Sequence, residues 1–261
     1  MRIVFPELES TIIKEAVSAF NTKNSESPIE AIPASSLEEA CALCKNGTAD
    51  ALIAGIDYTT RDMVLACKDY LGATGKTFSS CFVMKHASPL VGLPNTLILA
   101  DAGVTKNPTT EQLTDIVLQT YETALKILDD EPRIAMLSFS TFGSAKDESI
   151  DKTTSVISIV KATHPEIKID GEMQLDCAVN PRVAEKKLTG RSSDVAGHAN
   201  VLIAPDLNSG NILYKSLEQF GGYTAAGPIL QGFTKPCSDL SRGSTKEDVE
   251  LVIKIIKKLV N

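Results

Sequence analysis

No apolar run in this sequence approaches the roughly 20 residues that a membrane-spanning helix needs, and its first residues, MRIVFPELES, lack a signal-peptide pattern. The dinucleotide fingerprint G-x-G-x-x-G and the nucleophile elbow G-x-S-x-G are also missing, which counts against a nicotinamide enzyme and a serine hydrolase. The six cysteines follow no disulfide framework, so we expect reduced thiols. These absences predict a soluble, cytoplasmic protein with no membrane partner.

Positive charge is scarce as well. Lys and Arg total 26 against 33 Asp and Glu, giving a net charge of −7, which argues against a nucleic-acid partner. An acidic enzyme that acts on an anionic substrate must therefore concentrate its cations locally. The three histidines are isolated, and the pair Cys41 and Cys44 falls on one face of an expected amphipathic helix. We expect packed core thiols and no metal site, because no further ligands complete a tetrahedral set.

Short β-branched runs alternate with longer segments of helical period, which predicts an α/β fold with parallel strands and crossover helices. The expected strands are 2–5, 29–32, 51–54, 81–84, 97–100, 133–138, 167–169, 201–204 and 226–230. The expected helices are 11–20, 37–45, 61–71, 111–128, 150–163, 212–220 and 246–259. Ser36 with Glu39, and Ser244 with Glu247, fit capping boxes at two helix starts.

Several of these strands end in polar or small residues, namely Gly55, Asp101, Ser140, Asp170, Asp206 and Gly232. In open α/β sheets ligands collect outside the carboxyl ends of the strands. Four patches there combine glycines with hydroxyls, and some with cations: residues 137–146, 205–211, 227–236 and 239–244. Helix starts with free amides, together with a guanidinium, bind phosphate. Each patch alone also fits a simple helix cap.

A fifth glycine-rich segment, GATGKT at 72–77, is similar to the end of a phosphate-binding P-loop. Tyr70 stands where the first glycine is required, and no buried strand immediately precedes it. The P-loop needs its strand, loop and helix together. We therefore favour the other four patches as the phosphate site.

The stretch GPILQGFTKPCSDLSRGSTKED at 227–248 closely resembles the signature of the phosphate acetyl/butyryltransferase family, and its SRG block is more similar to the acetyl-transferring members. The likeness continues in ADALIAG at 49–55, AMLSFSTFGSAK at 135–146, IDGEMQLDCAVNPRVAEKK at 169–187 and VLIAPDLNSGNILYK at 201–215. It implies two α/β/α domains with an interdomain cleft, in the isocitrate/isopropylmalate dehydrogenase-like class. Residues 1–74 with 230–261 would form one domain and 75–229 the other, usually in a homodimer.

The resemblance also implies reversible transfer of an acetyl group between acetyl phosphate and coenzyme A, with inorganic phosphate released and no further cofactor. By that likeness Asp248 is the base that deprotonates the thiol, while Ser241 and Arg242 stabilise the transition state and hold the phosphate. We expect direct transfer in a ternary complex. The further substrate contacts that we expect come from the four patches: Ser140, Thr141, Gly143, Ser144, Asn208, Asn211, Lys235 and Gly243.

The sequence also departs from the family pattern. A basic segment that we expect before the ADALIAG strand is absent, and two family arginines align with Leu65 and a position near Ile12. Arg61, one turn before Leu65, is the expected substitute for binding coenzyme A. Three alternatives stay open at this point: a longer acyl group such as butyryl, a nicotinamide dehydrogenase of the same fold class, and a non-catalytic phosphate-binding relative.

Overall fold

The computed structural model describes residues 1–87 and 95–260, and its contacts divide the chain into two compact units. Unit 1 consists of Met1–Ser80 and Ala226–Asn261, and unit 2 consists of Cys81–Ala225. The chain therefore leaves unit 1 once and returns to it. The sequence predicts domain boundaries at 74/75 and 229/230, and these stay a prediction.

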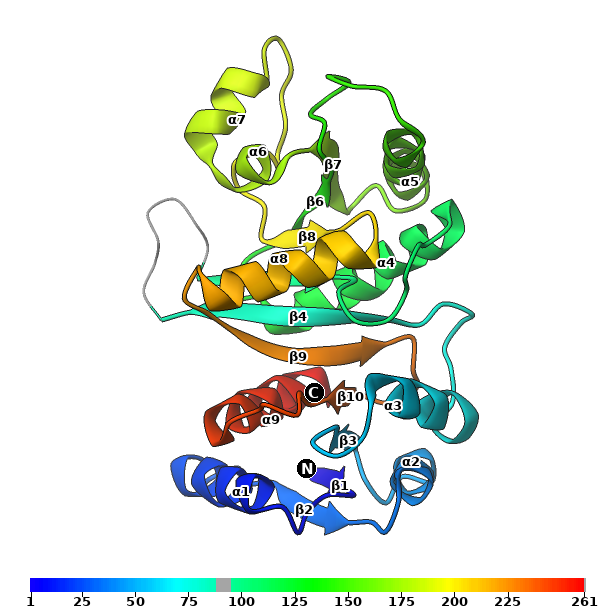
Figure 1. Cartoon of the computed structure of the whole chain (residues 1–261), viewed down its shortest axis with the longest axis vertical. Coiled ribbons are helices and arrows are strands. Elements are labelled where there is room, and N and C mark those ends of the chain that lie inside the picture. Colours follow the sequence, from blue (N-terminus) through cyan, green and yellow to red (C-terminus); the bar gives the residue numbers. More distant parts are fainter. Residues whose placement is uncertain (88–94, 261) are drawn as a thin grey trace. The chain divides into compact units, whose positions relative to one another are not determined.

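Unit 1 is a sheet with helices on both faces. Its strands lie in the order β2 (Glu30–Pro33), β1 (Arg2–Phe5), β3 (Ala51–Ala54), β10 (Cys237–Asp239) and the second half of β9 (Tyr223–Gln231). Figure 1 shows α1 (Thr11–Lys23) and α9 (Lys246–Val260) on one side of this sheet, where they pack on each other. On the other side lie α2 (Leu37–Lys45), α3 (Thr60–Ala66) and the π-helical turn η1 (Cys67–Leu71).

Unit 2 has the same layered plan. Its strands lie in the order β4 (Ser79–His86), β5 (Thr96–Ala100), β8 (Val201–Ile203), β6 (Arg133–Leu137) and β7 (Lys168–Met173). One face carries α4 (Thr110–Ile127) and α5 (Glu148–Thr163), which pack on each other. The other face packs in one hydrophobic cluster with α6 (Leu175–Val179), α7 (Pro181–Lys187) and α8 (Leu207–Gln219).

The expectation of parallel strands throughout is wrong for two pairs. β4 runs antiparallel to β5, and β10 runs antiparallel to β9. Nine residues, 87–95, separate the first pair and five, 232–236, the second. A parallel connection needs a dozen or more residues, so these segments are too short for a crossover. Six pairs are parallel as predicted: β1 with β2 and β3, β3 with β10, β8 with β5 and β6, and β6 with β7.

Of the two predicted capping boxes, the one at α2 forms in part and the one at α9 forms one residue later. The Ser36 side chain accepts from the Glu39 amide and caps α2 as expected, although the Glu39 carboxylate bonds Ser35 instead. At α9 the predicted box of Ser244 with Glu247 is wrong by one residue. Thr245 and Asp248 form it: the Asp248 carboxylate accepts from the Thr245 amide and hydroxyl, each at 2.8 Å.

The six cysteines are buried free thiols, and Cys41 and Cys44 lie on the core side of α2, as expected. The Sγ atoms of Cys41 and Cys67 lie 4.0 Å apart. Among residues 1–87 and 95–260, no three His, Cys, Asp or Glu side chains group so as to hold a metal ion. Over the same residues, every helix is too short or too polar to cross a bilayer.

Candidate active site

A pocket of about 470 Å³ lies in unit 1 at the carboxyl ends of β3 and β10. The two strands pair in parallel with Ala54 opposite Asp239, so the turn after β3 lies beside the segment after β10 although about 180 residues separate them in sequence. The pocket is lined by residues from both segments: Gly55, Tyr58, Thr59, Thr60, Arg61, Asp239, Leu240, Ser241 and Arg242. It therefore unites three of the predicted site residues, Arg61, Ser241 and Arg242.

The pocket has an excess of positive charge. Its lining holds two guanidinium groups, those of Arg61 and Arg242, against one carboxyl, that of Asp239. Both arginines are exposed, and within the described chain neither forms an ion pair. Ser241 Oγ accepts from the Gly243 amide at 3.3 Å, which leaves the hydroxyl proton available for another acceptor. The predicted local concentration of cations is thus present in an acidic protein.

Asp239 is the buried member of this lining, with only 2% of its surface exposed. One carboxylate oxygen, Oδ2, accepts from the Thr60 hydroxyl at 2.5 Å, whereas Oδ1 has no hydrogen-bond partner among the described residues. Burial, together with the nearby negative charge of Glu7, raises the pKa of Asp239 to about 6 against the lowering effects of Thr60 and Arg242. The sequence placed Asp239 in a polar patch but gave no sign that it is buried.

The raised pKa of Asp239 predicts a pH-dependent loss of stability. Between its ordinary value of 3.8 and about 6 the folded protein binds this proton more tightly than the unfolded chain does. The free energy of unfolding therefore falls as the pH rises through this range, by roughly 1 to 3 kcal/mol. We expect Asp239→Asn to gain stability relative to the parent between pH 4 and pH 7, measured by urea unfolding at both values. An equal difference at both values would contradict the assignment.

Asp248 lies on the first turn of α9 and is half-buried. It is not among the residues that line the pocket of Arg242. Its carboxylate accepts two hydrogen bonds from Thr245 at the helix cap. Five residues separate it from Arg242 along the connecting segment, whose turn is closed by a bond from the Ser244 amide to the Ser241 carbonyl. Its role as a base stays a prediction.

Lys235 lies at the other end of β10. It precedes the strand, whereas Ser241 and Arg242 follow it. Burial raises the pKa of the Cys44 thiol, at the carboxyl end of α2, and the positive charge of Lys235 partly offsets this rise. Within unit 1 the structure therefore separates Lys235 from the other residues predicted to bind the substrate, whereas Gly243 lies next to Ser241.

In unit 2 the predicted loop after β6 is organised around a buried carboxylate. Glu172 Oε1 accepts from the Ser140 hydroxyl and the Gly143 amide, both at 2.8 Å, and the side chain is 2% exposed. Ser144 Oγ lies 3.1 Å from Ser140 Oγ and accepts from the Thr141 amide. These donors, proposed from the sequence for phosphate, are thus already engaged inside the protein. Glu172 was not recognised, because it follows the loop by about 30 residues.

The start of α8 supplies the last two predicted contacts. Asp206 caps the helix by accepting from the Ser209 amide at 2.9 Å. Asn211 donates from Nδ2 to the carbonyl of Ala102 at 3.1 Å, so its amide ties α8 to the turn after β5. Asn208 is exposed on the first turn. Of the two, Asn208 is the one whose side chain stays accessible.

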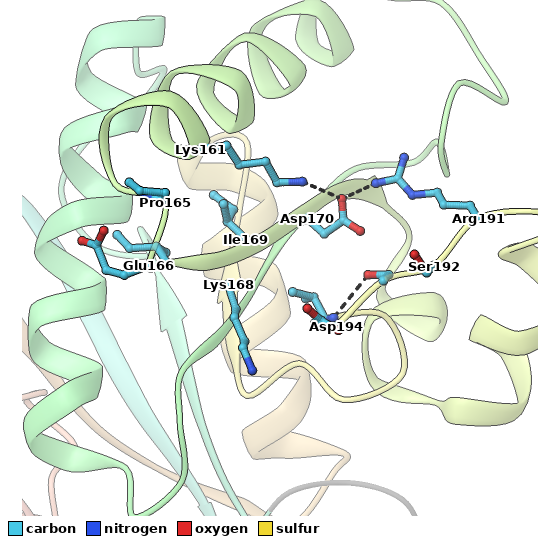
Figure 2. Close-up of a pocket in the computed structure, with 12 residues that line it drawn as sticks. Lys161, Pro165, Glu166, Lys168, Ile169, Asp170, Arg191, Ser192 and Asp194 are labelled. Atoms are coloured by element: carbon cyan, nitrogen blue, oxygen red, sulfur yellow. Dashed lines mark hydrogen bonds and ion pairs between the residues drawn. The ribbon is translucent and has the colours of Figure 1, made fainter.

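Two further pockets in the described residues lack the charge of the first. A pocket of about 410 Å³ in unit 2, drawn in Figure 2, is lined by three cations and three carboxylates. Its central group is Asp170, which is buried and pairs with Lys161 at 3.5 Å and with Arg191. A pocket of about 510 Å³ in unit 1, which includes Leu65, has three acidic residues and no cation in its lining. Neither offers an anion the surplus of positive charge found beside Arg242.

Two α/β units, one with a cationic pocket at the carboxyl ends of parallel strands, place the chain in the dehydrogenase-like α/β fold class. The fold is shared with 4-hydroxythreonine-4-phosphate dehydrogenase from Klebsiella pneumoniae at a TM-score of 0.55 and 12% identity, over 100% of this chain and 90% of that one. The predicted fold class is therefore confirmed. The chain belongs to the phosphate acetyl/butaryl transferase family, whose model matches residues 28–256.

Named relatives agree with this membership. The chain is 45% identical to a phosphate acetyltransferase of Clostridium acetobutylicum, over 81% of this chain and 63% of that protein. It superposes on a phosphotransacetylase from Streptococcus pyogenes with a TM-score of 0.86 and 30% identity, over 99% of this chain and 93% of that one. The chain thus spans a little under two-thirds of the curated relative and nearly all of the solved one.

Proposed function

We propose that this protein transfers an acetyl group reversibly between acetyl phosphate and the thiol of coenzyme A. The observation that carries the proposal is the pocket of Arg61, Ser241 and Arg242, whose lining has a surplus of positive charge, in a member of this family. A guanidinium can bind two phosphoryl oxygens at once, which favours an acyl phosphate as the occupant. Coenzyme A is a substrate here, and we propose no resident cofactor.

The chemistry divides among three residues of the pocket and Asp248, which lies outside its lining. Arg242 holds the phosphoryl group, and Ser241 donates its hydroxyl proton to the carbonyl oxygen as negative charge develops there. The thiol of the acceptor has an ordinary pKa of about 8.5, so a nearby base is needed at neutral pH, and we assign this role to Asp248. The thiolate attacks the acyl carbon directly. Arg61, on the α3 side of the pocket, is our candidate for a contact with coenzyme A.

The decisive experiment mixes the purified protein with acetyl phosphate and coenzyme A and follows thioester formation by absorbance. We expect acetyl phosphate to react faster than butyryl phosphate. A faster reaction with butyryl phosphate would favour the longer-acyl alternative. Reduction of a nicotinamide cofactor by a hydroxy acid, without thioester formation, would replace this proposal by the dehydrogenase. Phosphate binding with neither reaction would identify a non-catalytic relative.

We also propose, on family resemblance, that the protein is a homodimer. Light scattering would test this.

Two variants test the assigned roles. We expect Arg242→Gln to lower kcat/KM for acetyl phosphate about 10²-fold, because a charge-assisted bidentate contact is lost. We expect Asp248→Asn to lower kcat by roughly 10² to 10⁴, as for loss of a general base, while the asparagine oxygen can still accept the cap bonds of Thr245. Steady-state kinetics with both substrates varied would separate these effects.

The matched controls lie outside the pocket. Glu247→Gln changes the neighbouring carboxylate of α9, which is exposed, and Arg182→Gln removes an exposed guanidinium in unit 2. We expect both to retain parental kinetics. If Arg242→Gln and Asp248→Asn behaved like these controls, the site assignment would be wrong.

A further inference from the structure

Asp239 differs from the other buried carboxylates that hold turns in this protein. Glu7 accepts from the amides of Gly55 and Asp57, and Glu172 accepts from two donors on one oxygen. Asp101 accepts from three successive turn amides, those of residues 103, 104 and 105. Each of these three carboxylates is thereby stabilised by backbone donors. Asp239 is equally buried, yet its carboxylate accepts its hydrogen bond from a side chain that also lines the pocket, that of Thr60.

An incompletely bonded buried carboxyl is costly to keep ionised, so its presence calls for an explanation. Asp239 Oδ1 is one of two buried side-chain atoms without a partner in the described chain, and the only one of the two that belongs to the pocket lining. Thr60 lines the same pocket, and its hydroxyl lies 2.5 Å from Asp239 Oδ2. Carboxyl and hydroxyl together can pass a proton in either direction, because a hydroxyl both donates and accepts.

The proposed reaction needs such a group. When a thiolate displaces phosphate from the dianion of an acyl phosphate, the bridging oxygen leaves with a third negative charge unless it gains a proton. Arg242 and Arg61 reduce the cost of this charge but have no proton to give, since a guanidinium stays protonated. Asp248, as the base for the thiol, takes a proton rather than supplying one. The chemistry therefore leaves a second proton-handling role to be filled.

The geometry points to Thr60 and Asp239 as a proton relay for the leaving phosphate, an inference that rests on the proposed function. The sulfur–carbon bond forms and the carbon–oxygen bond breaks with its electron pair on oxygen. The bridging oxygen takes the Thr60 hydroxyl proton, and Thr60 takes the proton of Asp239. The thiol proton goes to Asp248, so one proton is gained and one is lost. In the reverse reaction Asp239, through Thr60, accepts the proton of the attacking phosphate.

The surroundings of Asp239 suit exchange of a proton near neutral pH. Burial and the charge of Glu7, on the turn after β1, favour the protonated form, whereas Thr60 and Arg242 favour the ionised one. The other titratable groups of the pocket are Arg61 and Tyr58, both from the segment after β3. A dianionic ligand would favour protonation further by like-charge repulsion. The resulting pKa, about 6 before a ligand binds, is low enough to give up a proton and high enough to take one back.

Two variants and two controls test the relay. Asp239→Asn and Thr60→Val should each lower kcat by roughly 10² or more, while Thr60→Ser, which keeps the hydroxyl, should stay near the parent. Asp57→Asn, an exposed aspartate on the neighbouring turn that does not line the pocket, is the matched control. The distinguishing readout is the ratio of parental to Asp239→Asn kcat. In thioester formation this ratio should fall as the pH rises through the pKa of Asp239 in the ligand complex, which lies above 6, and in acetyl phosphate formation it should rise.

A purely structural role for Asp239 would lower both directions by the same factor at every pH, and that result would overturn the relay. Equal rates for Thr60→Val and Thr60→Ser would overturn it as well, even if Asp239→Asn failed to fold. A readout independent of catalysis is the carboxyl ¹³C NMR titration of the free protein. One aspartate should titrate near pH 6, disappear in Asp239→Asn and shift to higher pH in Thr60→Val. If the parent forms no thioester at all, the proposed function is wrong, and the relay, which depends on it, is wrong as well.

Discussion

Gly55→Ala should destabilise the protein by about 3 to 5 kcal/mol, because both the backbone conformation and the available space at this position require glycine. Gly55 has φ +120°, a conformation that L side chains rarely adopt. A Cβ built here would lie 2.5 Å from the Leu240 nitrogen and 2.6 Å from its carbonyl oxygen, and closer still to Asp239 Oδ1. Leu240 cannot easily give way, since its amide bonds the Ala54 carbonyl at 2.6 Å.

The matched control is Gly47→Ala. Gly47 also has a positive φ, +81°, but a Cβ there meets no atom within 4 Å. We expect a cost of about 1 kcal/mol from backbone strain alone. Urea unfolding of both variants measures the difference, and Gly55→Ala should in addition lose phosphate binding, because the displaced segment carries Ser241 and Arg242. Equal losses of stability in the two variants would show that β3 and β10 do not approach as closely as described.

The close approach of β3 and β10 also explains which parts of the site could be predicted from the sequence. Ser241 and Arg242 were identified within one continuous motif. Arg61 was assigned only by its position near Leu65, and it is the parallel register of β3 with β10 that brings it to the same pocket. β10 itself, residues 237–239, was missed because three residues are too few for a recognisable pattern. Without that strand, the burial of Asp239 beside Gly55 could not be foreseen.

The start of a helix could be predicted where the sequence offers a single capping residue. α2 begins and ends as predicted because Ser36 caps an amphipathic run and a Gly follows its end. At α9 two adjacent hydroxyl residues, Ser244 and Thr245, are each followed three positions later by an acidic residue. Sequence alone does not choose between them, and the structure selects Thr245. The choice has a consequence for function, because it engages Asp248, the proposed base, in the cap.

Glu172→Ala should cost about 3 kcal/mol of stability in unit 2 and release the loop after β6. Glu172 Oε1 accepts both the Ser140 hydroxyl and the Gly143 amide, so truncation leaves two donors without their acceptor. Phe142 stays tied through its amide, which bonds the backbone carbonyl of Glu172 at 2.9 Å. Urea unfolding would give the loss of stability, and hydrogen exchange of residues 140–145 would report the loosened loop.

Glu172→Gln is the informative comparison, because the bonds from Ser140 and Gly143 reach the same carboxylate oxygen. The glutamine carbonyl oxygen can take the place of Oε1 and keep both donors satisfied, at a cost of about 1 kcal/mol for the lost charge assistance. A Gln variant as unstable as the Ala variant would mean that the negative charge itself holds the loop. An Ala variant as stable as the parent would mean that other contacts suffice, such as the Arg191 guanidinium over the Phe142 ring at 4.0 Å. In either variant, tighter phosphate binding would reveal that Glu172 competes with the substrate for the donors of Ser140 and Gly143, and weaker binding would reveal that it positions them.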